Sequence, residues 1–350
     1  MEKIVPIALA LSLLFTASVL SPEASHIAGQ GGALRHYNPQ DLDDLSFSWN
    51  IERIEVPQAW RKTAGSEDVV VAIIDSGIDS TLPELANRMW TNEDEIPGNG
   101  IDDDGNGYVD DVHGWDFRDD DSSSMCGSKI HWHGTFIAGI VAAQPDTGSV
   151  LGVAPGIRIM DVRFLDSKNR FYGRDWKKFV QAIDYAVDNG ARVVNLSLYA
   201  NGQPPLILER ALERAARHGV IVVGISGNDA SLDVCYPGKY STVLAVSATD
   251  RDDHLASFSN YGREVRVAAP GDKISSLFPG GAVGTSSGTS FSAPHVSGTL
   301  ALILSCNPSL SAAEAVRLLE ETSIDIGSSG RDKEFGAGLI DAGQAVTRAL

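Results

Sequence analysis

The sequence predicts a three-layer α/β fold, in which a mainly parallel sheet carries helices on both faces. From residue 69 onward, short β-rich runs alternate with amphipathic segments, which is the pattern of strand, helix and strand units. The amphipathic segments repeat Leu, Ile, Val and Ala at spacings of three and four residues. A length of 350 residues with 43% hydrophobic and 21% charged residues suits a compact soluble protein. We therefore expect one large α/β domain over residues 51–350.

The expected elements follow one another along the chain and are joined by right-handed crossovers. Pro308 and Ser311 mark the break between the last two helices, because proline stops a helix and serine caps the next one. Strands are predicted at residues 69–75, 158–164, 192–198, 220–225, 243–247 and 265–269, and helices at residues 176–189, 206–218, 290–305 and 312–320.

The N-terminus has the pattern of an export signal. Lys3 precedes an apolar stretch over residues 4–20, and small or polar residues follow it. The alternative is an uncleaved anchor, but Pro6 interrupts the stretch, which falls short of the roughly 20 residues of a spanning helix. We expect a signal peptide over residues 1–25 and a short N-terminal segment or reduced propeptide over residues 26–50.

Charge and cysteine content restrict the function classes. The chain has 28 Lys and Arg against 46 Asp and Glu, a formal charge of −18, which argues against nucleic acid or an anionic membrane as partner. Three cysteines are too few for a disulfide framework and form no CxxC metal pattern. Cys306 follows an apolar run, which indicates a buried residue. A bridge between Cys126 and Cys235 stays open, because disulfide geometry is restrictive.

Three residues far apart in the sequence suit nucleophilic catalysis. Asp75 ends the predicted strand VVVAIID, His133 begins the helical string HGTFIAGIVAA, and Ser290 begins an apolar helix among small residues. A serine hydroxyl needs a neighbouring base, and the base needs a carboxylate to hold its tautomer. Taken singly, Asp75 and Ser290 are better explained as helix caps and His133 as an ordinary polar residue. Their order along the chain, Asp, His, Ser, is that of the catalytic triad in subtilisin.

Seven motifs in this order resemble the subtilisin-like serine proteases, the subtilase family. They are AIIDSGID, HGTFIAG, VVNLSL, GISGN, YPGKY, GTSFSAPHVSG and GAGLIDA, and the resemblance covers residues 49–346. It implies a secreted serine endopeptidase with a subtilisin-like fold. It also implies Asp75 as orienting carboxylate, His133 as general base and acid, Ser290 as nucleophile and Asn228 as oxyanion donor. Without the resemblance, Asn228 after Gly227 is explained as a turn residue.

The same resemblance implies where a substrate binds. A peptide would lie as an added strand beside Ser197, Leu198 and Tyr199, and Cys235 would lie at the floor of the pocket for the residue before the scissile bond. We expect very bulky residues to be disfavoured there. Tyr199 stands where the family usually has glycine. Further departures are Phe136 for a histidine, Phe291 for a methionine, and Asn169, Arg170 and Phe171 in a facing edge segment that is usually glycine-rich.

An acidic loop predicts a calcium site. Oxygen-bearing side chains alternate as at positions 1, 3 and 5 of an EF-hand loop, but position 12 is His113 rather than Glu. The alternative is a solvated acidic loop, although carboxylates so close together repel one another without a cation. The resemblance implies a second calcium site in the loop QPDTGSV. The predicted ligands are Asp102, Asp104, Asn106, the Tyr108 carbonyl and Asp111 (or Asp110) at the first site, and Glu84 and Asp146 at the second.

Two other functions compete with the protease. A fold that has lost its activity would serve as a calcium-dependent binding protein, and an esterase or acyltransferase would share the acyl-enzyme. The filled catalytic roles favour the protease. We expect a secreted monomer that acts on protein and peptide substrates, without nucleic acid and without stable membrane insertion once the signal is removed. Whether a propeptide or another chain assists its folding stays open.

Overall fold

The computed structural model describes residues 4–5, 45–125, 127, 129–145, 150–200 and 202–350. Of the predicted signal peptide, only β1 (Ile4–Val5) is described, paired antiparallel with β5 (Phe171–Tyr172). Cys126 and Asp146 lie outside the described residues, so the predictions that involve them stay predictions. Among the described residues, no helix is both long and apolar enough to cross a membrane.

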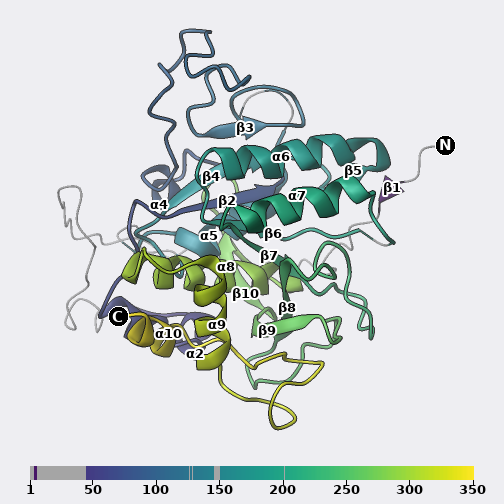
Figure 1. Ribbon diagram of the computed structural model, residues 1–350. Helices are drawn as coiled ribbons and strands as arrows, with labels where there is room; N and C mark the ends of the chain where they lie inside the picture. Colours follow the sequence, from purple (N-terminus) through teal and green to yellow (C-terminus); the bar gives the residue numbers. More distant parts are fainter. Residues whose placement is uncertain (1–3, 6–44, 126, 128, 146–149, 201) are drawn as a thin grey trace.

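A seven-stranded parallel sheet forms the centre of the described chain (Figure 1), in the order β3-β4-β2-β6-β7-β8-β9. All six predicted strands are present. The seventh strand, β3, was not predicted, because its three residues are too few to show a pattern in the sequence. Its first residue, Gly114, has a positive φ, and a Cβ there would lie 1.8 Å from the Asp161 carbonyl oxygen. The strands are β2 Val70–Asp75, β3 Gly114–Asp116, β4 Arg158–Arg163, β6 Val193–Leu196, β7 Ile221–Ile225, β8 Val243–Thr249 and β9 Val265–Pro270.

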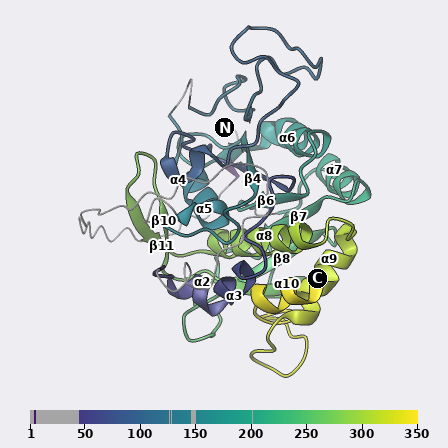
Figure 2. The ribbon, with the colours of Figure 1, turned by 90° about the vertical axis from the view of Figure 1, so that its left-hand side faces the viewer.

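Side chains alternate across the sheet and build a core on each face. On β2, Val71 and Ile73 join one core, whereas Val70, Ala72 and Ile74 join the other. Figure 2 shows helices on both sides of the sheet, which confirms the predicted three-layer fold. One face carries α5 Trp132–Ala142, α8 Thr289–Cys306, α9 Ala312–Thr322 and α10 Ala342–Ala349, and the other carries α6 Trp176–Asp188 and α7 Leu206–Arg217.

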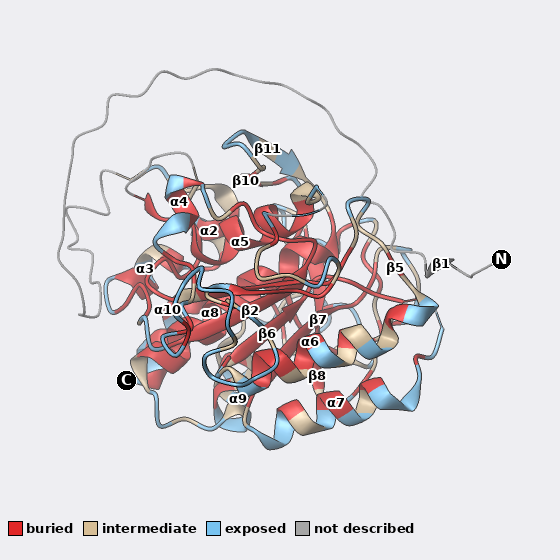
Figure 3. Ribbon diagram, turned by 90° about the horizontal axis from the view of Figure 1, so that it is seen from above, coloured by how far each residue is buried: buried red, intermediate tan, exposed pale blue. Residues whose placement is uncertain are grey.

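The helices differ in how much of their surface is exposed to solvent, according to where they lie in the fold. In α6 and α7 one side of the helix is buried and the other is exposed (Figure 3), and the buried residues are apolar ones that pack against the sheet. By contrast, α8 is buried along almost its whole length. The predicted start of α9 is confirmed by a capping box, in which Ser311 Oγ accepts from the Glu314 N–H at 3.3 Å and the Glu314 carboxylate accepts from the Ser311 N–H at 2.9 Å.

Several short elements were not predicted because each holds too few residues to show a period. They surround the sheet and include an antiparallel hairpin, β10 paired with β11. These elements are α2 Trp49–Arg53, α3 Val56–Trp60, α4 Pro83–Ala86, the 3-10 turn Gly173–Asp175, β10 Ile274–Leu277 and β11 Val283–Ser286.

Candidate active site

Three neighbouring strands place polar residues at one edge of the sheet. Asp75 is the last residue of β2, Ser197 directly follows β6, and Asn228 follows the end of β7. The three strands are adjacent and parallel. Their carboxyl ends therefore meet at the same edge, which is where parallel α/β sheets carry their reactive groups.

His133 is hydrogen-bonded to Asp75 from the first turn of α5. Its Nδ1 lies 2.9 Å from Oδ1 and 3.0 Å from Oδ2 of Asp75, and both side chains are buried. An ionised carboxylate only accepts, so Nδ1 carries the proton and Nε2 is left as the basic nitrogen. The Ser76 N–H also donates to Asp75 Oδ1, at 2.7 Å, and so fixes the orientation of the carboxylate.

A close backbone approach brings α5 to the end of β2. A Cβ at Gly134 would lie 2.4 Å from the Gly77 carbonyl oxygen, so the helix fits only with glycine there. The Gly134 N–H donates to Ser76 Oγ at 3.0 Å, and this hydroxyl donates to the His131 carbonyl at 3.2 Å. These contacts position the imidazole against Asp75.

His131 caps α5 next to the base. Its Nδ1 accepts from the His133 N–H at 3.3 Å. Burial, with a smaller contribution from His133, lowers the pKa of His131 to about 4. His131 is therefore uncharged at neutral pH and adds no positive charge beside the His133 ring.

Ser290 lies in the first turn of α8 and exchanges hydrogen bonds with Ser197. Ser290 Oγ donates to the Ser197 carbonyl at 3.2 Å, and Ser197 Oγ donates to the Ser290 carbonyl at 2.7 Å. The second bond has a local cause. Pro294 lacks the N–H that would bond the carbonyl four residues earlier, and Ser197 satisfies this carbonyl instead.

The hydroxyl of Ser290 is hydrogen-bonded to the Ser197 carbonyl. Among the described residues, the Ser290 hydroxyl has no hydrogen bond to His133, although the next side chain, Phe291, packs against the His133 ring with centroids 5.7 Å apart. Catalytic hydrogen bonds often form only when substrate is bound. Attack therefore requires the hydroxyl to turn from the Ser197 carbonyl toward the imidazole.

The side chain of Asn228 is held by Thr289 through its amide oxygen. Its Oδ1 accepts from the Thr289 N–H and from Thr289 Oγ1, both at 2.8 Å. With the oxygen held, the amide N–H groups of Asn228 can donate elsewhere. The backbone N–H of Ser290, in the first turn of α8, has no acceptor among the described residues. These donors can bind an anionic oxygen beside Ser290.

A buried carboxyl, Asp161 on β4, lies beside this edge. Its Oδ2 accepts from Ser124 Oγ and, at 3.3 Å, from the Ile78 N–H. Its Oδ1 has no hydrogen-bond partner in the described part of the chain. Burial raises the pKa of Asp161 to about 7. Sequence reasoning missed this residue, although an acidic residue inside the apolar run RIMDVRF was the signal for it.

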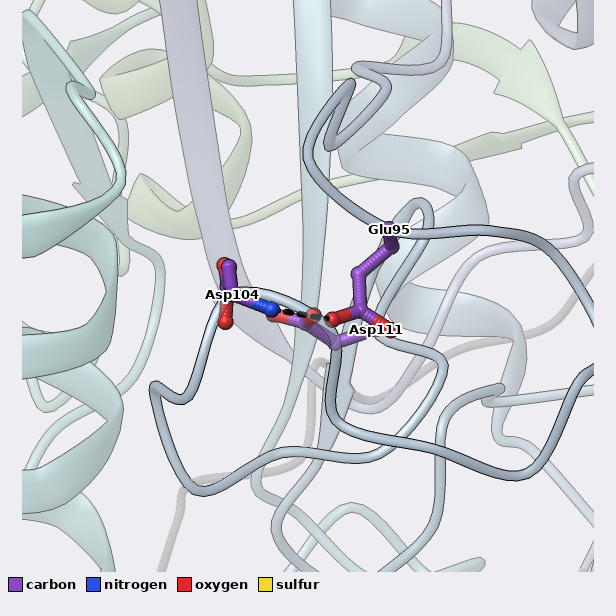
Figure 4. Close-up of side chains that lie close together, drawn as sticks. All are labelled: Glu95, Asp104 and Asp111. Carbon is purple, nitrogen blue, oxygen red and sulfur yellow. Dashed lines mark hydrogen bonds between the residues drawn. The ribbon is translucent and has the colours of Figure 1, made fainter.

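Three carboxylates gather in the acidic loop between α4 and β3. Glu95, Asp104 and Asp111 each offer an oxygen within 4.8 Å of the others (Figure 4). Glu95 and Asp111 are buried, and burial raises the pKa of Asp111. Such a set of hard oxygen atoms suits a divalent cation. Glu95 was not predicted as a ligand, because it lies seven residues before the alternating Asp pattern.

Other polar groups hold all three carboxylates, and Glu95 accepts from the backbone N–H groups of Asp103 and Asp110 at 2.8 and 3.0 Å. The Asn92 amide donates to Asp104 and Asp111, both at 3.0 Å, and the Asn106 amide donates to the same two at 2.9 and 3.2 Å. The Tyr185 hydroxyl donates to Asp111 at 2.6 Å. Of the predicted ligands, the structure therefore brings Asp104, Asn106 and Asp111 together.

Two further predicted ligands of the first site lie beside the cluster. Asp102 accepts from the backbone N–H groups of Asn106 and Gly107 at 3.0 and 2.9 Å, so it shapes the loop and is not one of the three clustered carboxylates. The Tyr108 ring packs against Trp115, with centroids 5.0 Å apart. At the second predicted site, Glu84 is buried, and its carbonyl accepts from the Gln144 N–H at 3.0 Å.

Comparison with known proteins gives the same family over most of the chain. The profile of the subtilase family matches residues 66–338. Subtilisin BL from Lederbergia lenta is 34% identical over 303 residues, which is 87% of this chain and 99% of that protein. Thermitase from Thermoactinomyces vulgaris is 35% identical over 312 residues, 89% of this chain and 99% of that protein. The minor extracellular protease Epr of Bacillus subtilis is 34% identical over 301 residues, 86% of this chain and 42% of that protein.

The chain belongs to the subtilase family. It is a subtilisin-type serine endopeptidase, an enzyme that hydrolyses peptide bonds. In this subtilase, the two aromatic residues that depart from the family pattern, Phe136 and Phe291, belong to one aromatic cluster beside the His133 ring. Phe136 and Phe291 pack with centroids 4.7 Å apart, Phe136 also packs against Phe278 at 5.6 Å, and Phe278 stacks on Trp132 at 5.0 Å.

The residues expected to flank a substrate in the subtilase are buried. Leu198 and Tyr199 are almost fully buried. The backbone N–H and carbonyl of Leu198 have no hydrogen bond in the described part of the chain. Cys235 lies near Gly227, and its Sγ accepts from the Asn260 amide at 3.4 Å. Burial raises the pKa of the Cys235 thiol to about 12, which keeps it protonated and unreactive.

Proposed function

We propose that Asp75, His133, Ser290 and Asn228 are the catalytic residues of this endopeptidase. The observation that carries the proposal is the buried contact of Asp75 with His133 Nδ1, which leaves Nε2 basic. The first turn of α8 presents the Ser290 hydroxyl at the same edge of the sheet, where its acceptor is the Ser197 carbonyl.

The reaction begins when the Ser290 hydroxyl turns to His133. Nε2 takes the proton as Oγ bonds to the substrate carbonyl carbon, and Asp75 stabilises the imidazolium. The new oxyanion accepts from the Asn228 amide and the Ser290 N–H. His133 then gives its proton to the leaving nitrogen, the peptide bond breaks, and an acyl-enzyme forms on Ser290. Water, deprotonated by His133, releases the acid and restores the serine.

We propose that the substrate binds as an extended strand. The position of Ser197 supports this, because its carbonyl accepts from the Ser290 hydroxyl at 3.2 Å and the stretch after β6 therefore lies beside the nucleophile. Backbone pairing of this kind supplies affinity for many peptide sequences.

A substitution at Ser290 tests the assignment. We expect Ser290→Ala to lower kcat by about 10⁶-fold and to abolish labelling by a fluorophosphonate. Ser292→Ala is a matched control, because Ser292 is buried in the same helix and its Oγ has no hydrogen-bond partner in the described part of the chain. Peptide and ester substrates are compared, since turnover of esters alone would favour the esterase. Full peptidase activity in Ser290→Ala would exclude Ser290 as the nucleophile.

We propose that the cluster of Glu95, Asp104 and Asp111 holds calcium, with Asn106 beside it. The supporting observation is that two of the three clustered carboxylates are buried, where like charges repel strongly without a cation. Bound calcium would supply positive charge that holds the loop together. A second site at Glu84 and Asp146 is a further proposal, which the closeness of α4 to Gln144 supports.

We also propose that the enzyme is exported and acts as a monomer, with residues 1–25 as signal, 26–50 as a short segment before the catalytic domain, and 51–350 as that domain. The apolar N-terminal stretch supports export. Mass spectrometry of the N-terminus after expression in a secreting host tests the cleavage, and light scattering tests the monomer. Retention of residues 1–25 in a membrane fraction would favour the anchor instead.

A further inference from the structure

One residue, Asn260, contacts both sides of the segment that carries the proposed oxyanion donor. Asn228 follows β7, and Asn260 lies between β8 and β9. Because β7 and β8 are adjacent and parallel, the segments that follow their carboxyl ends meet at the same edge of the sheet. Asn260 is buried at this meeting point.

The two peptide units that flank Asn228 are both hydrogen-bonded to Asn260. The backbone N–H of Asn260 donates to the Gly227 carbonyl at 2.9 Å, and its Oδ1 accepts from the Asp229 N–H at 2.7 Å. The first bond holds the planar peptide unit before Asn228, and the second holds the planar unit after it. Because these two units set the backbone dihedrals of Asn228, they also set the direction in which its side chain leaves the backbone.

The side chain of Asn260 has only one orientation that satisfies all its polar atoms. Its Oδ1 also accepts from the Ser231 N–H at 3.1 Å, and its amide nitrogen donates to the Asp233 carbonyl at 2.9 Å and to Cys235 Sγ at 3.4 Å. Together with the bond from Asp229, these contacts use both lone pairs of the oxygen and both N–H groups. A rotated amide would leave buried polar atoms unpaired, so this orientation is fixed.

The turn that contains Asn228 depends on contacts from the segment around Asn260. Ala230 has a φ of 51°, which is unfavourable for a residue with a Cβ, and its N–H donates to the Phe258 carbonyl at 2.9 Å. The Asn260 amide also packs directly on the turn, since a Cβ at Gly227 would lie 2.5 Å from Asn260 Nδ2. These contacts hold a backbone conformation that the turn would not favour alone.

We propose that Asn260 is a positioning residue for oxyanion stabilisation, because it holds the backbone of Asn228 so that the free amide N–H groups reach the oxyanion beside Ser290. Thr289 holds the other end of the same side chain, at Oδ1. Asn260 thus acts only through Asn228. This inference rests on the proposed function, in which Asn228 is the oxyanion donor.

A double-mutant cycle with Asn228→Ala tests this role. We expect Asn260→Ala to lower kcat on a peptide substrate by about 10- to 10²-fold with little change in KM, because the displaced donor bonds only the transition state. In the Asn228→Ala background, the same substitution should lower kcat by less than about threefold, since the donor that it positions is already absent.

A second variant and a matched control separate positioning from loss of stability. Asn260→Ser keeps a short polar side chain, and its smaller loss of kcat should also disappear in Asn228→Ala; it carries the comparison if Asn260→Ala does not fold. Asn307→Ala is the control, because Asn307 is half-buried at the other end of α8, where it bonds the Ser309 N–H and the Ala349 carbonyl at 3.3 and 3.2 Å. It should lower Tm and leave kcat, measured well below Tm, unchanged in both backgrounds.

The outcomes distinguish this inference from the proposed function. Equal losses of kcat from the Asn260 substitutions in the two backgrounds would overturn the inference, because Asn260 would then act independently of Asn228. Wild-type kcat in both Asn260 variants would overturn it as well. Wild-type kcat in Asn228→Ala itself would instead overturn the proposed oxyanion role of Asn228, and this inference with it.

Discussion

Two of the proposed catalytic side chains, His133 and Asn228, are each held by one atom, so that another atom is left free to react. Asp75 binds His133 at Nδ1 and leaves Nε2, and Thr289 binds Asn228 at Oδ1 and leaves the amide N–H groups. A histidine or asparagine with both ends free would lose much of its function, because its tautomer or rotamer would be unfixed.

The Asn228 amide should act mainly in the transition state. We expect Asn228→Ala to lower kcat by about 10²- to 10³-fold with little change in KM, because the donor bonds an oxyanion that the ground state lacks. Steady-state kinetics on a peptide substrate measure both constants. A large rise in KM at unchanged kcat would instead show a role in ground-state binding.

The buried carboxyl of Asp161 should make stability fall as pH rises. Its folded-state pKa is about 7 against an ordinary value of 3.8, so between about pH 4 and pH 7 the unfolded chain has released a proton that the folded chain still binds. The free energy of unfolding therefore decreases across this window, and the loss is complete above it. A carboxyl whose pKa rises this far on folding changes the free energy of unfolding by about 4 kcal/mol at most.

The variant Asp161→Asn should remove this part of the pH dependence. Urea unfolding from pH 4 to pH 8, in a Ser290→Ala background that prevents self-digestion, measures the change. Asp252→Asn, which removes an exposed carboxylate, controls for the change in net charge. Equal slopes for the wild type and Asp161→Asn would contradict the assignment.

At the scale of elements, the active site depends on how closely α5 meets β2. The contact is made by backbone atoms, since a Cβ at Gly134 would collide with the Gly77 carbonyl. A strand end and a helix start that touch in this way leave little freedom, so the geometry of Asp75 and His133 follows from the packing of the two elements.

We therefore expect Gly134→Ala to impair catalysis more than folding. The added methyl must push α5 away from β2, and a displacement of about 1 Å can cost about 10²-fold in rate. Measurements of kcat/KM and of Tm separate the two effects. Gly173→Ala is the control, because a Cβ there meets no atom within 4 Å. Wild-type kcat/KM in Gly134→Ala would show that the close approach is unimportant.

At the scale of the whole molecule, the chain carries a net charge of −18, and part of this negative charge is concentrated in the acidic loop. Figure 1 shows this loop, between α4 and β3, extending from the rest of the fold. Its clustered carboxylates repel one another, so a cation that binds only the folded state would stabilise the whole molecule by mass action.

Removal of calcium should lower the melting temperature. At a calcium concentration 100 times Kd, binding contributes about 2.7 kcal/mol, and excess chelator removes it. Glu95→Gln should weaken the dependence of Tm on calcium. Asp103→Asn should not, because Asp103 bonds the Ile96 N–H and the Asn99 amide outside the cluster. An identical Tm with and without chelator would contradict the calcium proposal.

Much of the fold could be predicted because its pattern is local. Six strands and four long helices follow from apolar runs and from periods of three and four residues. β3 and the hairpin of β10 and β11 could not be predicted, since their pairing depends on distant partners. Glu95 escaped for the same reason, as its carboxylate reaches Asp104 and Asp111 only once the loop is folded.

The sequence by itself determined the layered fold, the family and the residue types available for chemistry, because these depend on periodicity and on motifs of adjacent residues. Only the tertiary structure decided which side chains meet: Asp75 with His133, Ser197 with Ser290, and Glu95 with Asp104 and Asp111. Such contacts join residues far apart in the chain, and they form only when packing of the two cores fixes the distances between the elements that carry them.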